Sequence, residues 1–182
     1  MAFESMMFGA TSFIWILYAF LWLFPVAYLI LRWRAYREQA PNDPHLGVKA
    51  ALYYFKTLAY HVMLVGTFCL LFGAINEYVR ENMMRLGAGL LLGGAIVYGA
   101  HAFIIDKRTN TLQFPAVARI YNGFNLVMTG LVAMAAVIAT LVMLFQEHTP
   151  AMVIRGALVL LLVYGAAWAS QAAFLFKRAE SA

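Results

Sequence analysis

Five apolar segments, separated by short polar stretches, account for nearly the whole chain. They predict helices at about residues 11–31, 50–75, 83–105, 119–145 and 152–176. A helix that crosses the hydrocarbon core of a bilayer needs roughly 20 mostly apolar residues, and each segment reaches that length. The pattern therefore predicts an all-α integral membrane protein with five transmembrane helices. The connections are too short for a further folded domain, so residues 1–182 are expected to form a single transmembrane domain.

The basic residues predict how these helices are oriented, because Lys and Arg are retained on the cytoplasmic side of a membrane. The predicted inner side carries Arg32, Arg34, Arg37, Lys49, Lys56, Lys107, Arg108, Arg119, Lys177 and Arg178, and the outer side carries Arg80, Arg85 and Arg155. Ten against three places the N-terminus outside and the C-terminus in the cytoplasm of a multi-pass protein. The expected location is the cell membrane, specifically a bacterial inner membrane.

The first segment is expected to be an uncleaved anchor. The residues before it contain Glu4 and no Lys or Arg, so the basic leader region of a signal peptide is missing. Its surface is rich in Phe, Trp and Tyr, which suits either lipid contact near the interfaces or docking against a partner.

Composition agrees with a lipid environment. The chain is 64% hydrophobic and 12% charged, whereas a soluble domain is about half apolar and a quarter charged. The net charge of +5 follows from the basic inner loops, and no basic stretch is interleaved with stacking aromatics, so no nucleic-acid partner is expected. Cys69 is the only cysteine, which excludes an internal disulfide and suits a small buried apolar side chain.

The third and fifth segments resemble each other without gaps at a spacing of 70 residues. The sequence RLGAGLLLGGAIVYGAHAFIIDKR from Arg85 aligns with RGALVLLLVYGAAWASQAAFLFKR from Arg155. Weaker matches between the second and fourth segments pair Tyr60-His61 with Phe124-Asn125 and Gly66 with Gly130. Either a duplication or the general similarity of apolar segments accounts for this match. It predicts one N-terminal anchor helix plus two hairpins that form a four-helix bundle.

Four polar residues fall at equivalent positions of this alignment, namely His61, His101, Asn125 and Gln171. Each lies about five residues from the predicted cytoplasmic boundary, or roughly 8 Å at 1.5 Å per residue. Tyr98 and Trp168 each lie three residues before a member of this layer and therefore share its helix face. Polar groups at this depth are costly and face the interior of a bundle. These six residues are the candidate site.

Three interpretations of this polar layer remain open. His61 and His101 could be the axial ligands of a b-type haem, since imidazole suits iron and bundle sites take ligands from facing helices; haem iron is the only metal expected there. The layer could instead hold a quinone head group by hydrogen bonds. The third interpretation is that these side chains satisfy one another across helices, which is worth about 1 kcal/mol per contact.

No hydrolase, metalloprotease or phosphate-loop motif is present, so an enzyme is not expected. The leading interpretation is a non-catalytic membrane subunit, an anchoring or structural component of a larger inner-membrane complex. Its expected partners are the lipid bilayer and either other subunits or further copies of the chain. The alternative is a redox subunit that binds haem b or quinone. A small transporter or channel ranks below both, because no carboxylate lies deep in a segment.

The third segment also carries closely spaced small residues. The patterns Gly89-xxx-Gly93 and Ala95-xxx-Gly99 allow two helix backbones to approach closely. We expect them to pack within the bundle of this chain rather than against another subunit.

Overall fold

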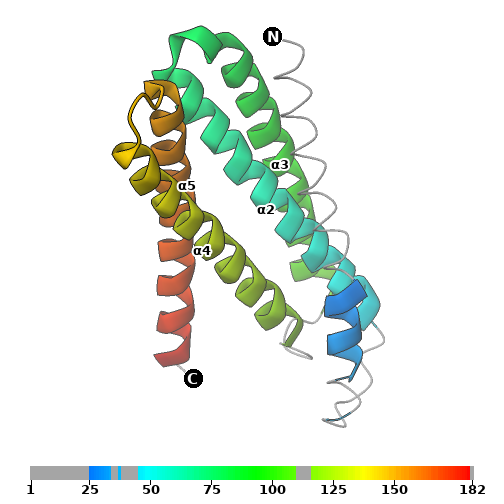
Figure 1. Ribbon diagram of the computed structural model, residues 1–182. Helices are drawn as coiled ribbons and strands as arrows, with labels where there is room; N and C mark the ends of the chain where they lie inside the picture. Colours follow the sequence, from blue (N-terminus) through cyan, green and yellow to red (C-terminus); the bar gives the residue numbers. More distant parts are fainter. Residues whose placement is uncertain (1–24, 34–36, 38–44, 110–115, 181–182) are drawn as a thin grey trace.

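The computed structural model describes residues 25–33, 37, 45–109 and 116–180 (Figure 1). Four long helices dominate it: α2 (Leu46–Ile75), α3 (Arg80–Arg108), α4 (Ala116–Phe145) and α5 (Ala151–Glu180), with a short 3-10 turn, η1 (Glu77–Val79), before α3. The described residues contain no strand. Residues 25–33 are also helical, but most of the predicted first helix, about 11–31, lies outside the described part of the chain.

Each of the four long helices contains a stretch long and apolar enough to cross a membrane. This confirms a membrane-embedded, all-helical protein. The helices extend one to four residues beyond most of the predicted bounds, because hydropathy marks only the apolar part of a helix whose backbone hydrogen bonds continue into the interface. α2, α4 and α5 each have 30 residues, or about 45 Å, against roughly 30 Å of hydrocarbon core.

The helices form two antiparallel hairpins, α2–α3 and α4–α5 (Figure 1). α2 is central and contacts α3, α4 and α5, whereas α3 makes no close backbone contact with α4 or α5. The four long helices thus form a helical bundle in which the ring of neighbours is open at α3. Figure 1 shows α4 and α5 close together near their connecting turn and diverging toward their other ends.

Local contacts and backbone conformation mark where the helices end. The buried side chain of Asn76 donates a hydrogen bond to the Phe72 carbonyl (3.4 Å) where α2 ends. The Thr109 hydroxyl donates to the Ile105 carbonyl (2.6 Å) at the end of α3. Between α4 and α5 the chain reverses through His148, whose φ of 68° lies in the left-handed region that few non-glycine residues adopt.

A seam of glycines joins α2 to α3; we call Gly66, Gly73, Gly87 and Gly94 the glycine seam. A Cβ atom placed on Gly66 would lie 2.6 Å from the Leu91 amide nitrogen, and one on Gly87 would lie 2.8 Å from the Gly66 carbonyl oxygen. Because real side chains do not come so close to backbone, only glycine permits this approach. The seam fixes α2 and α3 as the tightest pair in the fold.

The glycine patterns of α3 do not meet another of the long helices. A Cβ on Gly89, Gly93 or Gly99 would meet no described residue within 4 Å. The seam residues Gly87 and Gly94 are seven apart, which directs that face of α3 toward α2 and turns Gly89 and Gly93 away from it. α3 has no second helical neighbour to receive them among the long helices.

Two apolar clusters stabilise the ends of the assembly. One joins Ala27 and Leu31 to the starts of α2 and α4, and it includes Tyr54, Val117 and Tyr121. The other joins Phe72 of α2 to Val159, Val163 and Tyr164 of α5, close to the hairpin turns. The polar residues predicted as a layer lie between these clusters along the helices.

Candidate functional site

A cleft of about 430 Å³ lies where α4 diverges from α5. α2 and one residue of α3 complete its walls. Its lining is polar and aromatic and comprises Tyr53, Lys56, Thr57, Tyr60, Tyr98, Ala118, Tyr121, Asn122, Asn125, Ser170, Gln171, Phe174 and Leu175. This volume is within the range of small-molecule sites.

Helical spacing explains why these side chains face one space. The α2 residues are 53, 56, 57 and 60, and the α4 residues are 118, 121, 122 and 125. Both sets have the spacing i, i+3, i+4, i+7, which lines one face of a helix. α5 adds two pairs about one turn apart, Ser170-Gln171 and Phe174-Leu175. The cleft is therefore built from continuous faces of three helices rather than from loops.

Three buried polar atoms in this lining receive no hydrogen bond from the described residues. They are the hydroxyl of Tyr121, Oδ1 of Asn125 and Oε1 of Gln171. Tyr121 is only 1% exposed, and its ring stacks on Tyr53 with centroids 6.1 Å apart. Burying a polar group without a hydrogen bond costs roughly 1–3 kcal/mol, so the arrangement favours a bound polar group that supplies the missing partners.

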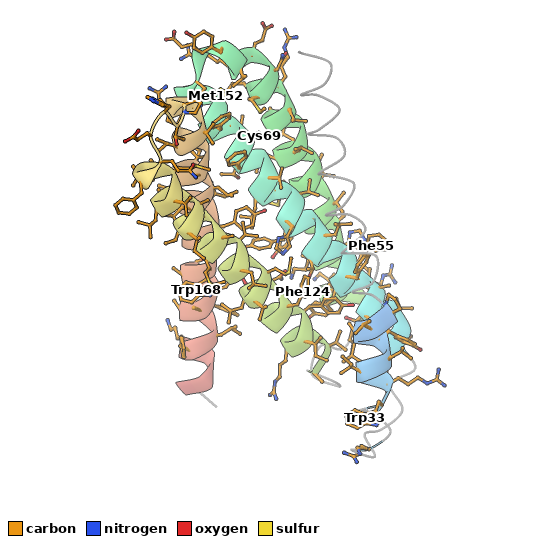
Figure 2. The ribbon with its side chains drawn as sticks, viewed as in Figure 1. Trp33, Phe55, Cys69, Phe124, Met152 and Trp168 are labelled. Atoms are coloured by element: carbon orange, nitrogen blue, oxygen red, sulfur yellow. The ribbon has the colours of Figure 1, made fainter. Side chains whose placement is uncertain are left out.

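His61 lies behind this wall of the cleft. It is 6% exposed, its ring meets Phe124 edge to face with centroids 6.3 Å apart, and it interacts with the side chain of Asn125. Figure 2 shows Phe124 in the space between α4 and α2. His61 thus supports Asn125 from α2 and does not itself line the cleft.

His101 lies in a different environment. Its Nδ1 donates a hydrogen bond to the Val97 carbonyl of its own helix (2.8 Å), and its ring packs beside Phe55 with centroids 5.5 Å apart. It is seven residues after Gly94, so it lies on the α3 face that meets α2.

The two histidines do not fit a haem held between them. Ala59 of α2 meets α3 at Gly94, and His61, two residues later, points about 200° away around the helix. His61 therefore faces α4 while His101 faces α2. Axial ligands of one haem must approach it from opposite sides of the same gap, which this arrangement does not provide.

The remaining predicted site residues separate into two groups. Tyr98, Asn125 and Gln171 line the cleft together, and the Tyr60 hydroxyl lies beside the Gln171 side chain. Trp168 does not line it. Its indole packs on α4, where a Cβ on Gly130 would lie 2.9 Å from the ring, and it is 45% exposed (Figure 2).

The sequence analysis missed Lys56 as a site residue. It was assigned only to the inner membrane boundary, yet its ammonium lies 5.1 Å from the Tyr98 ring centroid and 5.8 Å from that of Tyr53. Asn122 and Tyr60 were missed as well. The signal was present in the sequence, because the polar and aromatic residues of the second and fourth segments already show the i, i+3, i+4, i+7 spacing.

The described lining of the cleft offers groups that can bind a ligand. Its described lining holds one cation, four tyrosines and three carboxamides, with no carboxylate, histidine or cysteine. Across the described residues no group of three or more His, Cys, Asp or Glu side chains could hold a metal ion. Comparisons with protein-family models, with curated proteins and with solved structures find no match for this chain. Its function is therefore argued from the cleft itself.

Proposed function

We propose that the protein is a non-catalytic integral membrane subunit that holds a lipid-like ligand by its polar head in the cleft between α2, α4 and α5. In this proposal it spans a bacterial inner membrane with its N-terminus outside, and the cleft lies in the cytoplasmic half. The observation that carries the proposal is that Tyr121, Asn125 and Gln171, which line one cleft, each carry a buried polar atom without a hydrogen-bond partner among the described residues.

The alternative to a ligand site is a polar layer that only joins the helices through hydrogen bonds. If the polar layer served only to join helices, its members would hydrogen-bond to one another across the helix interfaces. The Asn125 and Gln171 side chains lie beside His61 and Tyr60 across the helix interfaces. Even so, Oδ1 of Asn125, Oε1 of Gln171 and the Tyr121 hydroxyl lack hydrogen-bond partners among the described residues. A head group with several polar atoms supplies them, while its hydrocarbon part remains in the bilayer.

The lining also supports a binding role rather than catalysis. General acid–base and nucleophilic sites bring a nucleophile or carboxylate within hydrogen-bonding distance of a second titratable group. The described lining offers only tyrosines and Lys56 as titratable groups. These can orient and hold a ligand.

Ligand retention tests the proposal directly. The full chain is purified in a mild detergent, and its bound small molecules are identified by native and denaturing mass spectrometry. We expect a lipid-like molecule at close to one per chain, lost at least tenfold in Gln171→Met. Gln146→Met, in the exposed turn after α4, is the matched control and keeps it. Equal retention by both variants, or no bound molecule in the unaltered chain, would sink the proposal.

A second role is favoured by the outer face of α3. No described residue would meet a Cβ on Gly89, Gly93 or Gly99, and α3 contacts only α2 among the long helices. A smooth face of this kind lets a helix of another subunit approach closely, in line with an anchoring or structural component of a complex. Cross-linking in native membranes from Gly93→Cys in a Cys69→Ala background should capture one partner at high yield. Capture no greater than from Glu147→Cys would exclude it.

The redox alternative remains testable through the identity of the ligand. A quinone would be found among the extracted molecules, and its ultraviolet spectrum would change on reduction. A Soret band lost in both His61→Ala and His101→Ala would revive the haem that the geometry disfavours. A colourless protein with an ordinary lipid in the cleft supports the non-catalytic proposal.

A further inference from the structure

Lys56 gives the cleft a charge that nothing else in its described lining balances. It is the only cation there, and the lining includes no Asp or Glu. Its ammonium lies between two aromatic rings, 5.8 Å from the centroid of Tyr53 on its own helix and 5.1 Å from that of Tyr98 on α3. Cation–π contacts of this kind position an ammonium group without neutralising it.

A fixed positive charge in a partly buried site attracts an anion more strongly than the same charge in water, because the local dielectric constant is lower. Lysine is a compact donor that binds phosphate as a point charge. A phosphate group beside Lys56 would therefore find the one position in this lining where negative charge is stabilised.

The other side of the cleft calls for hydrogen-bond donors. Oδ1 of Asn125 and Oε1 of Gln171 are buried acceptors without donors. A phosphate or a quinone carbonyl offers only acceptors, whereas an alcohol hydroxyl donates one hydrogen bond and accepts others. The Tyr121 hydroxyl can donate to such a group as well as accept from it. The ligand that satisfies both sides carries a phosphate and free hydroxyls.

These groups lie at one level along the helices, close to the edge of the hydrocarbon core. Lys56 lies ten residues beyond the start of α2, Asn125 nine beyond the start of α4, and Gln171 nine before the end of α5. At 1.5 Å per residue each lies about 14–15 Å from its helix end. Helices of about 45 Å exceed a hydrocarbon core of roughly 30 Å by about 7–8 Å at each end. The level therefore lies about 7 Å inside the core, a depth that a lipid head group reaches by entering the polar cleft.

We propose that the cleft selects the head group of an anionic phospholipid with free hydroxyls, with Lys56 holding the phosphate and Asn125 and Gln171 accepting from the hydroxyls. This inference rests on the proposed ligand-binding function and deepens it. Tyr53 and Tyr98 act as positioning residues that hold the ammonium of Lys56 at the cleft.

Lipid titration of the full chain, delipidated and reconstituted in nanodiscs, tests the selection. The probes are phosphatidylglycerol, with a phosphate and two hydroxyls, phosphatidic acid, without those hydroxyls, and zwitterionic phosphatidylcholine. We expect phosphatidylglycerol to bind at least tenfold more tightly than phosphatidylcholine. Lys56→Gln should remove that preference by weakening phosphatidylglycerol binding at least tenfold and phosphatidylcholine binding much less, while Lys56→Arg retains it. Lys107→Gln, exposed at the end of α3, is the control and keeps the full preference.

The hydroxyl side is tested by Asn125→Leu, which should erase the preference for phosphatidylglycerol over phosphatidic acid and keep the preference of both over phosphatidylcholine. Thermal melts of each variant exclude unfolding as the cause. If all three lipids bind equally well, and Gln171→Met weakens the binding of each, the phosphate assignment is overturned and the ligand-binding function remains intact. No lipid bound at the cleft would overturn both. If free glycerol phosphate competes as well as phosphatidylglycerol does at the same concentration, the ligand is a soluble phosphate and not a lipid, which would overturn the assignment to a lipid.

Discussion

The α2–α3 and α4–α5 hairpins cross the molecule side by side with helices of almost equal length, yet different contacts hold each pair together. In the first hairpin, Gly66 meets the α3 backbone at Gly87 and Leu91. In the second, the aligned glycine, Gly130, meets the indole of Trp168. Backbone against backbone brings two helices to their closest approach, and an indole between them holds them farther apart.

This difference explains where the cleft can form. The glycine seam runs through Gly66 and Gly73 on α2 and leaves no room for a ligand between α2 and α3. α4 and α5 diverge beyond Trp168, and the space opens toward α2 (Figure 1). The first hairpin thus serves as a rigid support and the second as a wall of the cleft.

Substitution in the glycine seam should have the largest effect. Gly66→Ala puts a Cβ 2.6 Å from the Leu91 amide nitrogen and 3.0 Å from the Gly87 carbonyl oxygen. Backbone cannot move aside, so we expect a loss of about 3 kcal/mol in the free energy of unfolding, near the upper end for overpacking. Gly93→Ala, on the open face of the same hairpin, should be neutral or slightly stabilising. Unfolding by denaturant in detergent measures both, and equal losses would contradict the seam.

The cleft should respond in the opposite direction. Tyr121→Phe removes a buried hydroxyl without a partner and keeps the ring that stacks on Tyr53. We expect the delipidated protein to gain about 1–2 kcal/mol in unfolding free energy, while its ligand affinity falls. Tyr78→Phe is the matched control and should change neither, because Tyr78 is 96% exposed in the turn between α2 and α3. A destabilised Tyr121→Phe variant would show that the polar layer is interhelical glue after all.

Gly130→Ala should have a smaller effect than Gly66→Ala although the two glycines align. The added Cβ would lie 2.9 Å from the Trp168 ring, and a partly exposed side chain can shift where backbone cannot. The expected loss is about 1 kcal/mol, typical of an off-rotamer side chain, and it should vanish in a Trp168→Leu background. A loss as large as that of Gly66→Ala would show that both hairpins are packed alike.

The smallest effects on the free energy of unfolding should come from Arg85 and Arg155, which align with each other and lie near the starts of α3 and α5. Arg85 pairs with Glu81 on its own helix, whereas Arg155 donates to the Ile75 carbonyl of the other hairpin (3.4 Å). We expect Arg155→Gln to cost about 0.5–1 kcal/mol and Arg85→Gln about 0.3 kcal/mol, as for exposed pairs one helical turn apart. Unfolding free energies at low and high salt measure both. The reverse order would mean that Arg155 does not link the hairpins.

Much of the fold was decided by local properties of the sequence. Apolar length alone predicted the four long helices that the structure describes, each long and apolar enough to cross a membrane, because a lipid environment forces the backbone to satisfy its hydrogen bonds within each segment. The sequence also assigned the basic helix ends to one side. The structure places those ends, the start of α2, the end of α3, the start of α4 and the end of α5, at the same end of the molecule (Figure 1).

The site was only partly predictable. Asn125 and Gln171 were proposed from their depth and Tyr98 from its spacing to His101, but depth does not specify the direction in which a side chain points around its helix. For that reason His101 and Trp168 were grouped with residues they do not join, and Lys56 was left at the membrane boundary. The sequence of α3 also does not show whether Gly87 and Gly94 or Gly89 and Gly93 face a neighbouring helix.

Tertiary structure decided these matters because they depend on rotation and crossing angle between helices, which no single segment encodes. The glycine seam turns His101 toward α2 and leaves His61 directed at α4, and the Trp168 indole on Gly130 holds α4 and α5 apart where the cleft begins. Sequence determined that polar groups would lie at one level of a membrane bundle. Packing determined which of them share a space.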